Sequence, residues 1–427
     1  MGFIQKNEGL IILIKISKII RYYLFWFLLI DAISGYTRIY LGITNPLFNI
    51  GYWIRGPILA LFIIYYLNRL KKGTIFFDEL IAVLLFFYFI INMLINFQIG
   101  QSNRFIYENF PYILRLQFLI FFFVYIKNRS TELFDHKEKI IFYNFIVFSL
   151  SIIIGYLFGF GLESYRFEGT SKGMFQGGNS ASVLNLIFFS FFILNYKLRK
   201  SITAVSICFF NGFIIASKSV FGFIIPILFL ITRNFTNKNK LLFIIPLFLT
   251  IIILRAPITD IINNSYQKRF GINIEKSMKA AEKVGGLSKN QTLNLATSLI
   301  FRRSASLINQ MEKTFSDKFV FIIGTSFTGQ NIFWENRGEF WFKNASMDLF
   351  DFFFKFGIIG IFLLLIIILN NFRLYKPKNL SNSITLYLFI LYAFFGGHVI
   401  DSVTAGSLFY YFLAENNQKL SPIINEN

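Results

Sequence analysis

A chain of 427 residues that is 55% hydrophobic, holds 59 phenylalanines and is only 15% charged is too apolar for a soluble domain, which is about one quarter charged. Its 42 lysines and arginines exceed its 22 acidic residues, and this net charge of +20 would suggest a nucleic-acid partner in a soluble protein. In a membrane protein such an excess marks the cytoplasmic loops instead, so composition excludes a soluble fold and argues against nucleic acid.

Apolar runs follow one another along the whole chain. The first fifteen residues carry Lys6 and Lys15 but no cleavage site of small residues, so we expect no removed signal peptide. A span needs about 20 mostly apolar residues, because lipid offers the backbone no hydrogen-bond partner. Clear examples are residues 140–162, 241–254, 349–369 and 384–395.

Basic clusters separate many of these runs. They lie at residues 69–72, 127–139, 197–200, 233–240 and 373–378. Short loops rich in lysine and arginine stay in the cytoplasm, so every second loop is predicted to be cytoplasmic.

The stretch of residues 202–231 tests this alternation. It is too long for one span and has basic clusters on both sides, which one helix would place on opposite faces of the membrane. Two short spans put both clusters inside and leave Lys218 at the outer turn. The count is then about twelve spans, with both termini cytoplasmic.

Three loops face outward under this topology, at residues 98–111, 163–180 and 255–344. The last is long and polar, and its apolar residues at helical spacing within 274–311 predict one or two helices over the outer surface. The chain then divides into residues 1–254 with nine helices, the outer loop 255–344, and residues 345–427 with three helices and a cytoplasmic tail. We expect an all-α polytopic membrane protein.

Two small groups in the outer loops suggest anion binding. Arg166-Phe-Glu-Gly169 precedes Gly177-Gly-Asn179; the glycines let a backbone approach a ligand, and arginine suits phosphate. A flexible loop with incidental charge explains the same residues. Lys218 is either a second cation for a ligand or a lysine that extends to the membrane interface.

The long loop and the span after it add further charges. Arg302 and Arg303 are either ligand-binding cations or part of a solvated helix face. Asp348, Asp351 and Lys355 enter a span, where charges usually face a polar cavity and mark function. Asp351 and Lys355 are four residues apart and could simply pair with each other.

A polar segment interrupts the last apolar stretch. Gly396-Gly-His398-Val-Ile-Asp401-Ser402 places a histidine near an aspartate at a helix break. The two side chains are either a proton-accepting pair or part of a hydrogen-bonded turn, and the sequence leaves both interpretations open.

The order of these features resembles the O-antigen polymerase and O-antigen ligase families. The resemblance runs from Arg166 to Ser402, and its most specific pieces are Arg166-Phe-Glu-Gly169 with Gly178-Asn179, Ser217-Lys218, Met347-Asp348-Leu-Phe-Asp351 through Phe356-Gly-Ile-Ile-Gly360, and Gly397-His398 with Ser402. It implies a fold of the glycosyltransferase C type in a bacterial cytoplasmic (inner) membrane, and a polyprenyl-pyrophosphate-linked oligosaccharide as substrate. A chain-length regulator protein is a further implied partner.

The resemblance also implies roles for single residues. The catalytic candidates are Asp348, His398 and Arg303, and the candidates for binding pyrophosphate or glycan are Arg166, Gly169, Asn179, Lys218 and Arg302. Two departures matter. Lys218 stands where these families usually have arginine, and no histidine precedes Met347-Asp348 where ligases have one. The second departure favours a polymerase over a ligase.

Other classes of function remain as alternatives. A flippase for lipid-linked oligosaccharides also has about a dozen spans, but transporters often show internal repeats and short loops, and neither is seen here. Nothing resembles the filter of a channel. The single cysteine, Cys208, excludes a cysteine metal site, and no cofactor is expected.

Overall fold

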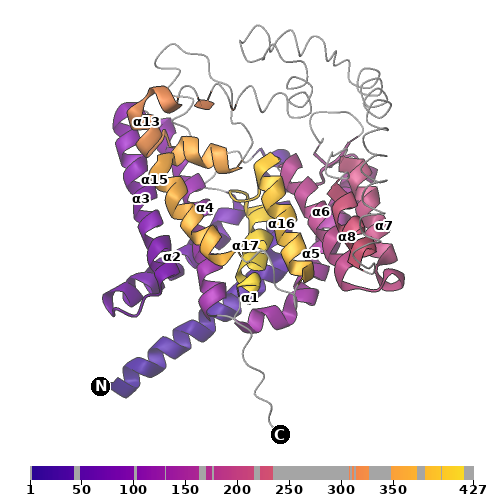
Figure 1. The fold of residues 1–427 in the computed structure, drawn as a ribbon, viewed down its shortest axis with the longest axis horizontal. Coiled ribbons are helices and arrows are strands. Elements are labelled where there is room, and N and C mark those ends of the chain that lie inside the picture. The colour runs from indigo at the N-terminus through magenta and orange to yellow at the C-terminus, as the bar shows by residue number, and fades with distance from the viewer. Residues whose placement is uncertain are drawn as a thin grey trace.

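The structure is a computed structural model. It describes residues 2–42, 49–100, 103–129, 131–162, 170–175, 177–215, 222–233, 307, 310–311, 314–326, 348–372, 380–395 and 397–417. These residues form helices and connecting turns, with no strand among them (Figure 1). Six of the described helices are long and apolar enough to cross a membrane. The predicted class, an all-helical multi-pass membrane protein, is therefore confirmed.

The helices follow the apolar runs of the sequence. Their bounds are α1 Gly2–Tyr40, α2 Ile50–Lys71, α3 Phe77–Gly100, α4 Asn103–Arg129, the 3₁₀ helix η2 Thr131–His136, α5 Lys137–Leu157, α6 Gly178–Asn195, α7 Leu198–Ile215, α8 Ile224–Arg233, α13 Lys318–Ile323, α15 Asp348–Asn371, α16 Leu380–Phe395 and α17 Val403–Asn416.

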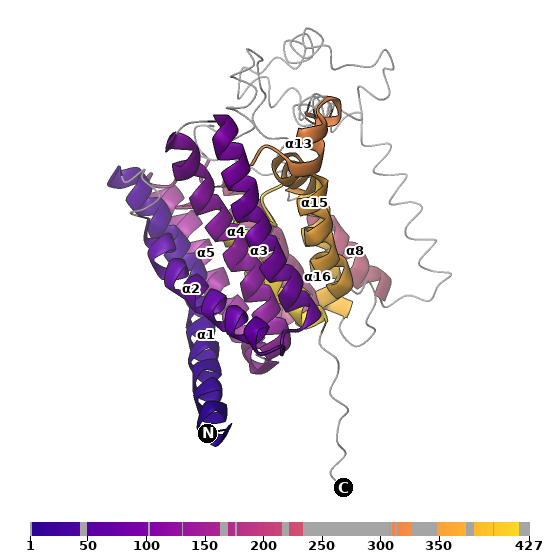
Figure 2. The same cartoon turned by 90° about the vertical axis from the view of Figure 1, so that its left-hand side faces the viewer.

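Helix α4 lies at the centre of the bundle, in contact with α2, α3 and α17 (Figure 2). Every residue from Leu116 to Ile126 is buried, as is almost the whole of α17. The span of α4 carries Arg115 and Gln117, and such polar side chains are costly against lipid, which explains why α4 is inside.

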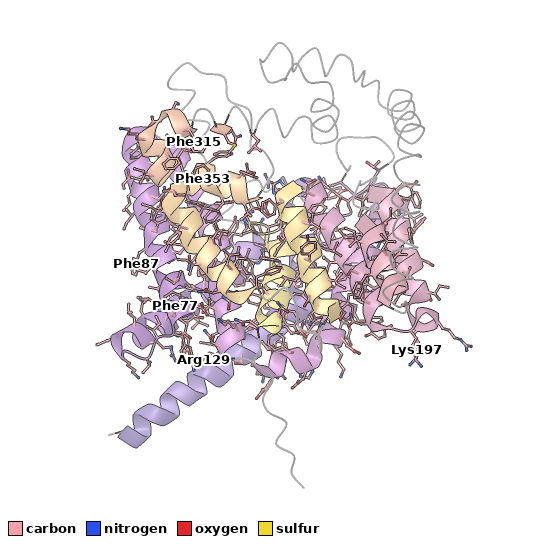
Figure 3. The ribbon with its side chains drawn as sticks, viewed as in Figure 1. Phe77, Phe87, Arg129, Lys197, Phe315 and Phe353 are labelled. Carbon is pink, nitrogen blue, oxygen red and sulfur yellow. The ribbon has the colours of Figure 1, made fainter. Side chains whose placement is uncertain are left out.

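Basic residues gather at one end of the bundle. Glu79 is fully buried there and pairs with Arg69 at 3.0 Å and with Arg129 at 3.6 Å, while Lys127 pairs with Asp78. Arg129 and Lys197 lie at the same end, the lower one in Figure 3, and the N-terminus of α1 lies there as well. We call this the basic end, and the opposite end, where Phe315 and Phe353 lie, the upper end.

The stretch of residues 202–231 forms two helices, α7 and α8, and both pack on α6. The stretch is thus divided into two helices, as the prediction of two spans requires, but neither is among the six described helices that are long and apolar enough to cross a membrane. The turn with Lys218 lies outside the described residues, as do residues 241–254 and most of the predicted outer loop. Its described part includes α13, which packs on α15 at the upper end.

Helix α15 is broken at Gly357, whose backbone is non-helical, with φ 62° and ψ −170°. A Cβ atom here would lie 2.3 Å from the carbonyl oxygen of Ile322, and one on Gly324 (φ 82°) would lie 2.4 Å from that of Lys355. Both positions therefore require glycine. The Ser326 N–H donates to the freed Lys355 carbonyl at 2.7 Å, so residues 324–326 are bound against the break. The first turns of α15, with Asp348 and Lys355, thus form a separate piece at the upper end.

Candidate functional site

A short loop between α16 and α17 forms the centre of the site, and Asp348 of α15 fixes its backbone. One carboxylate oxygen of Asp348 accepts the His398 N–H, and the other accepts the N–H groups of Val399 at 2.6 Å and Ile400 at 2.7 Å. Three backbone donors on one carboxylate hold the loop in a single conformation. These contacts give Asp348 a positioning task.

His398 has a left-handed backbone, with φ 62°, directly after Gly397 with φ 65°. This conformation is uncommon for a residue other than glycine and is found more often at functional sites. Ser180, in the first turn of α6, also contacts the loop. Its hydroxyl donates to the His398 carbonyl at 3.4 Å and lies 2.9 Å from the hydroxyl of Ser402, which caps α17.

Asp401 lies behind His398 and joins three helices. Tyr112 of α4 donates its hydroxyl proton to Oδ2 of Asp401 at 3.0 Å, and Lys355 Nζ lies 4.0 Å from the same oxygen and 3.4 Å from the Tyr112 hydroxyl. Lys355 is only 1% exposed, so solvent screens this interaction little. The sequence offered Asp351 as a possible partner of Lys355; the structure places the lysine beside Asp401 and Tyr112, which lie far away along the chain.

His398 and Asp401 form a pair at the surface of this group. His398 Nδ1 is 3.7 Å from Oδ1 of Asp401, a buried oxygen with no hydrogen-bond partner among the described atoms. The His398 side chain is 40% exposed, whereas that of Asp401 is 13% exposed. The imidazole therefore has a carboxylate beside Nδ1 and part of its ring accessible, which suits proton transfer to or from a bound ligand.

The surroundings of the pair favour its charged form. Burial alone would lower the pKa of His398, but its contact with Asp401 and the charges of Asp401 and Asp348 outweigh burial and raise that pKa above its ordinary value. Burial would raise the pKa of the Asp401 carboxyl, but His398, Lys355 and Arg115 hold it well below its ordinary range. Asp401 is thus ionised wherever His398 titrates.

We call Tyr112, Arg115, Asp348, Lys355, His398 and Asp401 the His398 cluster. Arg115 lies one turn along α4 from Tyr112, with its guanidinium carbon 4.9 Å from the centre of that ring. Its Nε is buried and has no hydrogen-bond partner among the described atoms. Two carboxylates, Asp348 and Asp401, and two cations, Arg115 and Lys355, thus face one another beside the imidazole. The N-terminal ends of α6, α15 and α17 meet here and add partial positive charge.

Three of the predicted site residues fall within the described structure. Asp348 and His398 are in direct contact, and Asn179 lies beside Ser180 in the first turn of α6. The other predicted site residues lie outside the described residues: Arg166, Gly169, Lys218, Arg302 and Arg303.

The sequence did not point to Tyr112 or Arg115. Both lie in α4, in Pro111-Tyr-Ile-Leu-Arg115, and Arg115 is the only charged residue between positions 109 and 126. The signal that could have found them is the arginine, because a lone charge in a span usually faces a polar interior.

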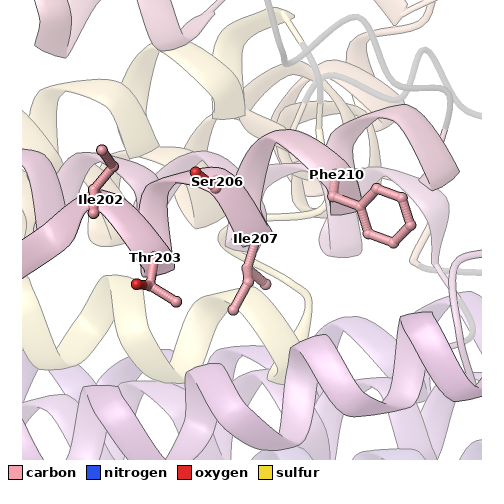
Figure 4. Close-up of a pocket in the computed structure, with 5 residues that line it drawn as sticks. All are labelled: Ile202, Thr203, Ser206, Ile207 and Phe210. Atoms are coloured by element: carbon pink, nitrogen blue, oxygen red, sulfur yellow. The ribbon is translucent and has the colours of Figure 1, made fainter.

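A hollow on the surface of α7 is not part of this site. It has a volume of about 470 Å³ and is lined by Ile202, Thr203, Ser206, Ile207 and Phe210 (Figure 4). Its lining holds two hydroxyls and no ionisable group, so it has nothing that would carry out acid–base chemistry. Among the described residues, no three His, Cys, Asp or Glu side chains are grouped to hold a metal ion.

We compared the chain with protein-family models, with curated proteins and with solved structures, and none of them matches it.

Proposed function

We propose that this protein polymerises lipid-pyrophosphate-linked oligosaccharide repeat units into a surface polysaccharide, O-antigen or capsule, at the outer face of the bacterial cytoplasmic membrane. The observation that carries the proposal is the His398–Asp401 pair. It is an accessible imidazole with an ionised carboxylate next to it, and its loop is bound to Asp348 at the start of α15, toward the upper end of the bundle. The order of motifs from Arg166 to Ser402 supplies the substrate class.

In the proposed reaction, a hydroxyl of the acceptor sugar attacks the anomeric carbon of the donor glycan. The new C–O bond forms as the bond between that carbon and the pyrophosphate oxygen breaks, and the lipid pyrophosphate leaves with the electron pair. His398 Nε2 takes the hydroxyl proton, and Asp401 stabilises the imidazolium through Nδ1. Metal and cofactor have no part in this proposal.

The leaving pyrophosphate gains negative charge, which preorganised cations stabilise. Lys355 and Arg115 supply positive charge within the described structure, together with the N-terminal ends of three helices. We retain Arg166, Lys218, Arg302 and Arg303 as further cations, with Gly169 and Asn179 as glycan or phosphate contacts. Asp348 is assigned to holding the loop, so that His398 is the base.

The membrane orientation follows from the charges. Short basic loops remain in the cytoplasm, so the basic end is cytoplasmic and the His398 cluster faces outward. We propose twelve spans, of which residues 241–254 form one, with both termini cytoplasmic and residues 255–344 outside.

Thiol labelling tests this orientation. In a Cys208→Ala background, single cysteines are placed at Lys289 and at Lys376. An impermeant reagent is expected to label intact cells at position 289 and to label position 376 only after lysis. Labelling of intact cells at 376 but not at 289 would reverse the topology.

A deletion strain tests the function. Loss of a polymerase leaves single repeat units on their final anchor and removes the ladder of longer chains from a polysaccharide gel. Loss of a ligase instead strands long chains on the carrier lipid, and loss of a flippase removes carrier-linked units from the outer face. We expect the first pattern, because no histidine precedes Met347-Asp348. Either of the other patterns would replace the proposed function.

A further inference from the structure

A second group of buried polar side chains lies deeper in the bundle, between α1, α2 and α17. The Tyr23 hydroxyl is 2.9 Å from the Ser407 hydroxyl and accepts a hydrogen bond from Arg55 Nε at 3.3 Å. Arg55 also donates to Asp31, and the two side chains are 11% and 10% exposed. Ionisable residues inside membrane-crossing helices are costly and rarely lack a task.

Tyr23 contacts both helices that determine the position of Asp401. Its hydroxyl binds Ser407 in the second turn of α17, and its ring packs edge-on against Phe118 of α4 at 5.1 Å. Tyr112, which binds Asp401, lies six residues from Phe118, a distance of about 9 Å along a helix. Asp401 precedes Ser407 by the same number of residues.

The ion pair determines where the Tyr23 hydroxyl points. Arg55 of α2 contacts α1 at two residues about two turns apart, Tyr23 and Asp31. These contacts fix the tyrosine between α2 and α17. The first turn of α17 is itself closely packed: a Cβ atom on Gly406 would lie 2.8 Å from the Val399 carbonyl oxygen. A small shift of α17 therefore moves the loop that carries His398 and Asp401.

We propose that Tyr23 is a positioning residue for the His398–Asp401 pair: oriented by Arg55 and Asp31, its hydroxyl holds α17 in register with α4, so that Asp401 meets both Tyr112 and His398. The inference rests on the proposed function of that pair. It assigns the deep ion pair to the same reaction and requires no second ligand.

The first test is a double-mutant cycle in the deletion strain. Tyr23→Phe and Ser407→Ala each remove one partner of the same hydrogen bond. Each is expected to lower the polymer yield per folded protein by about fivefold, the factor that corresponds to the net free energy of one hydrogen bond. The double variant is expected to be no worse than Tyr23→Phe, which also loses the hydrogen bond from Arg55. Tyr66→Phe is the control, because Tyr66 is equally buried but donates to the Phe121 carbonyl, away from the cluster.

The second readout is the pH dependence of the polymer ladder, measured in cells held between about pH 5.5 and 8, a window around the ordinary pKa of histidine. The charged and titratable groups around His398 are Asp401 on its own loop, Asp348 and Lys355 of α15, Tyr112 and Arg115 of α4, and Tyr410 of α17. Loosening Asp401 removes the strongest support for the imidazolium. The acid limb of activity is therefore expected to move to lower pH in Tyr23→Phe, and to stay unchanged in Tyr66→Phe.

Three outcomes separate the possibilities. A lower yield with an unshifted acid limb would show a merely structural role for Tyr23 and overturn the proposal. A normal ladder from both Tyr23→Phe and Ser407→Ala, with none from His398→Asn, would also overturn it and leave the proposed function standing. A normal ladder from His398→Asn would remove the proposed function itself.

Discussion

Replacing His398 by asparagine is expected to remove the polymer ladder. Asparagine tolerates the left-handed backbone of this position, so the loop keeps its shape, but it cannot accept the hydroxyl proton. Loss of a general base typically lowers the rate about 10²–10⁴-fold, and a variant expressed at the normal level would then make too little polymer to show a ladder. The measurement is a polysaccharide gel of the deletion strain carrying each variant, with protein levels compared on membrane fractions.

The chain provides a matched control for this experiment. It has two histidines, and the other one, His136, ends η2 beside the basic end. His136→Asn is expected to leave the ladder unchanged. A full ladder from His398→Asn at normal expression would contradict the proton-acceptor role.

The same assignment predicts the pH dependence of the wild type. An accepting imidazole must be neutral, so activity is lost as pH falls through the pKa of His398. Because the carboxylates of Asp401 and Asp348 raise that pKa, the loss is expected to begin above the ordinary histidine value of about 6.5. Asp401→Asn removes one of these charges and is expected to move the acid limb down.

Replacing Gly357 by alanine is expected to have the largest effect on stability. The left-handed backbone is strained for alanine, and its Cβ atom would overlap the backbone of Ile322, 2.3 Å away. Strain and overlap together are expected to lower the free energy of unfolding by about 2–5 kcal/mol. The measurement is thermal unfolding of the purified protein in detergent, with its yield in the membrane.

Gly159→Ala is the control for backbone conformation. Gly159 has φ 69°, but a Cβ atom added to it would have no neighbour within 4 Å, so alanine there meets the strain without the overlap. The free energy of unfolding of Gly159→Ala is therefore expected to fall by only about 1 kcal/mol, from backbone strain alone. Equal losses from the two variants would show that the close contact between the segment 322–326 and α15 contributes nothing.

The sequence was sufficient for the class of fold and for part of the site. Apolar runs of the right length predicted helices because lipid leaves the backbone no alternative, and the basic residues on both sides of 202–231 predicted two helices there. His398 and Asp401 are three residues apart, so their proximity could be seen in the sequence. The contacts of Tyr112 could not, because Asp401 and Lys355 are 289 and 243 residues away along the chain.

Local spacing was an incomplete guide in one place, for a physical reason. Asp351 and Lys355 have the spacing of an ion pair on a continuous helix, and this spacing says nothing of distant partners. The helix is interrupted at Gly357, two residues after Lys355, and the lysine lies between α4 and the His398 loop. A glycine in the sequence does not by itself predict such a break, because its left-handed backbone depends on the segment 322–326 that packs against it.

Helix α4 limits how deep the reaction lies in the bilayer. Tyr112 belongs to the His398 cluster and Lys127 to the basic end, and the fifteen residues between them span about 22 Å. The hydrocarbon layer is about 30 Å thick, so with Lys127 at its inner edge the cluster lies below the outer headgroups. Under the proposed function, an activated glycan at that depth would be farther from bulk water than one at the headgroups, and a second carrier lipid would bring in the acceptor hydroxyls. Depth would then favour chain growth over hydrolysis.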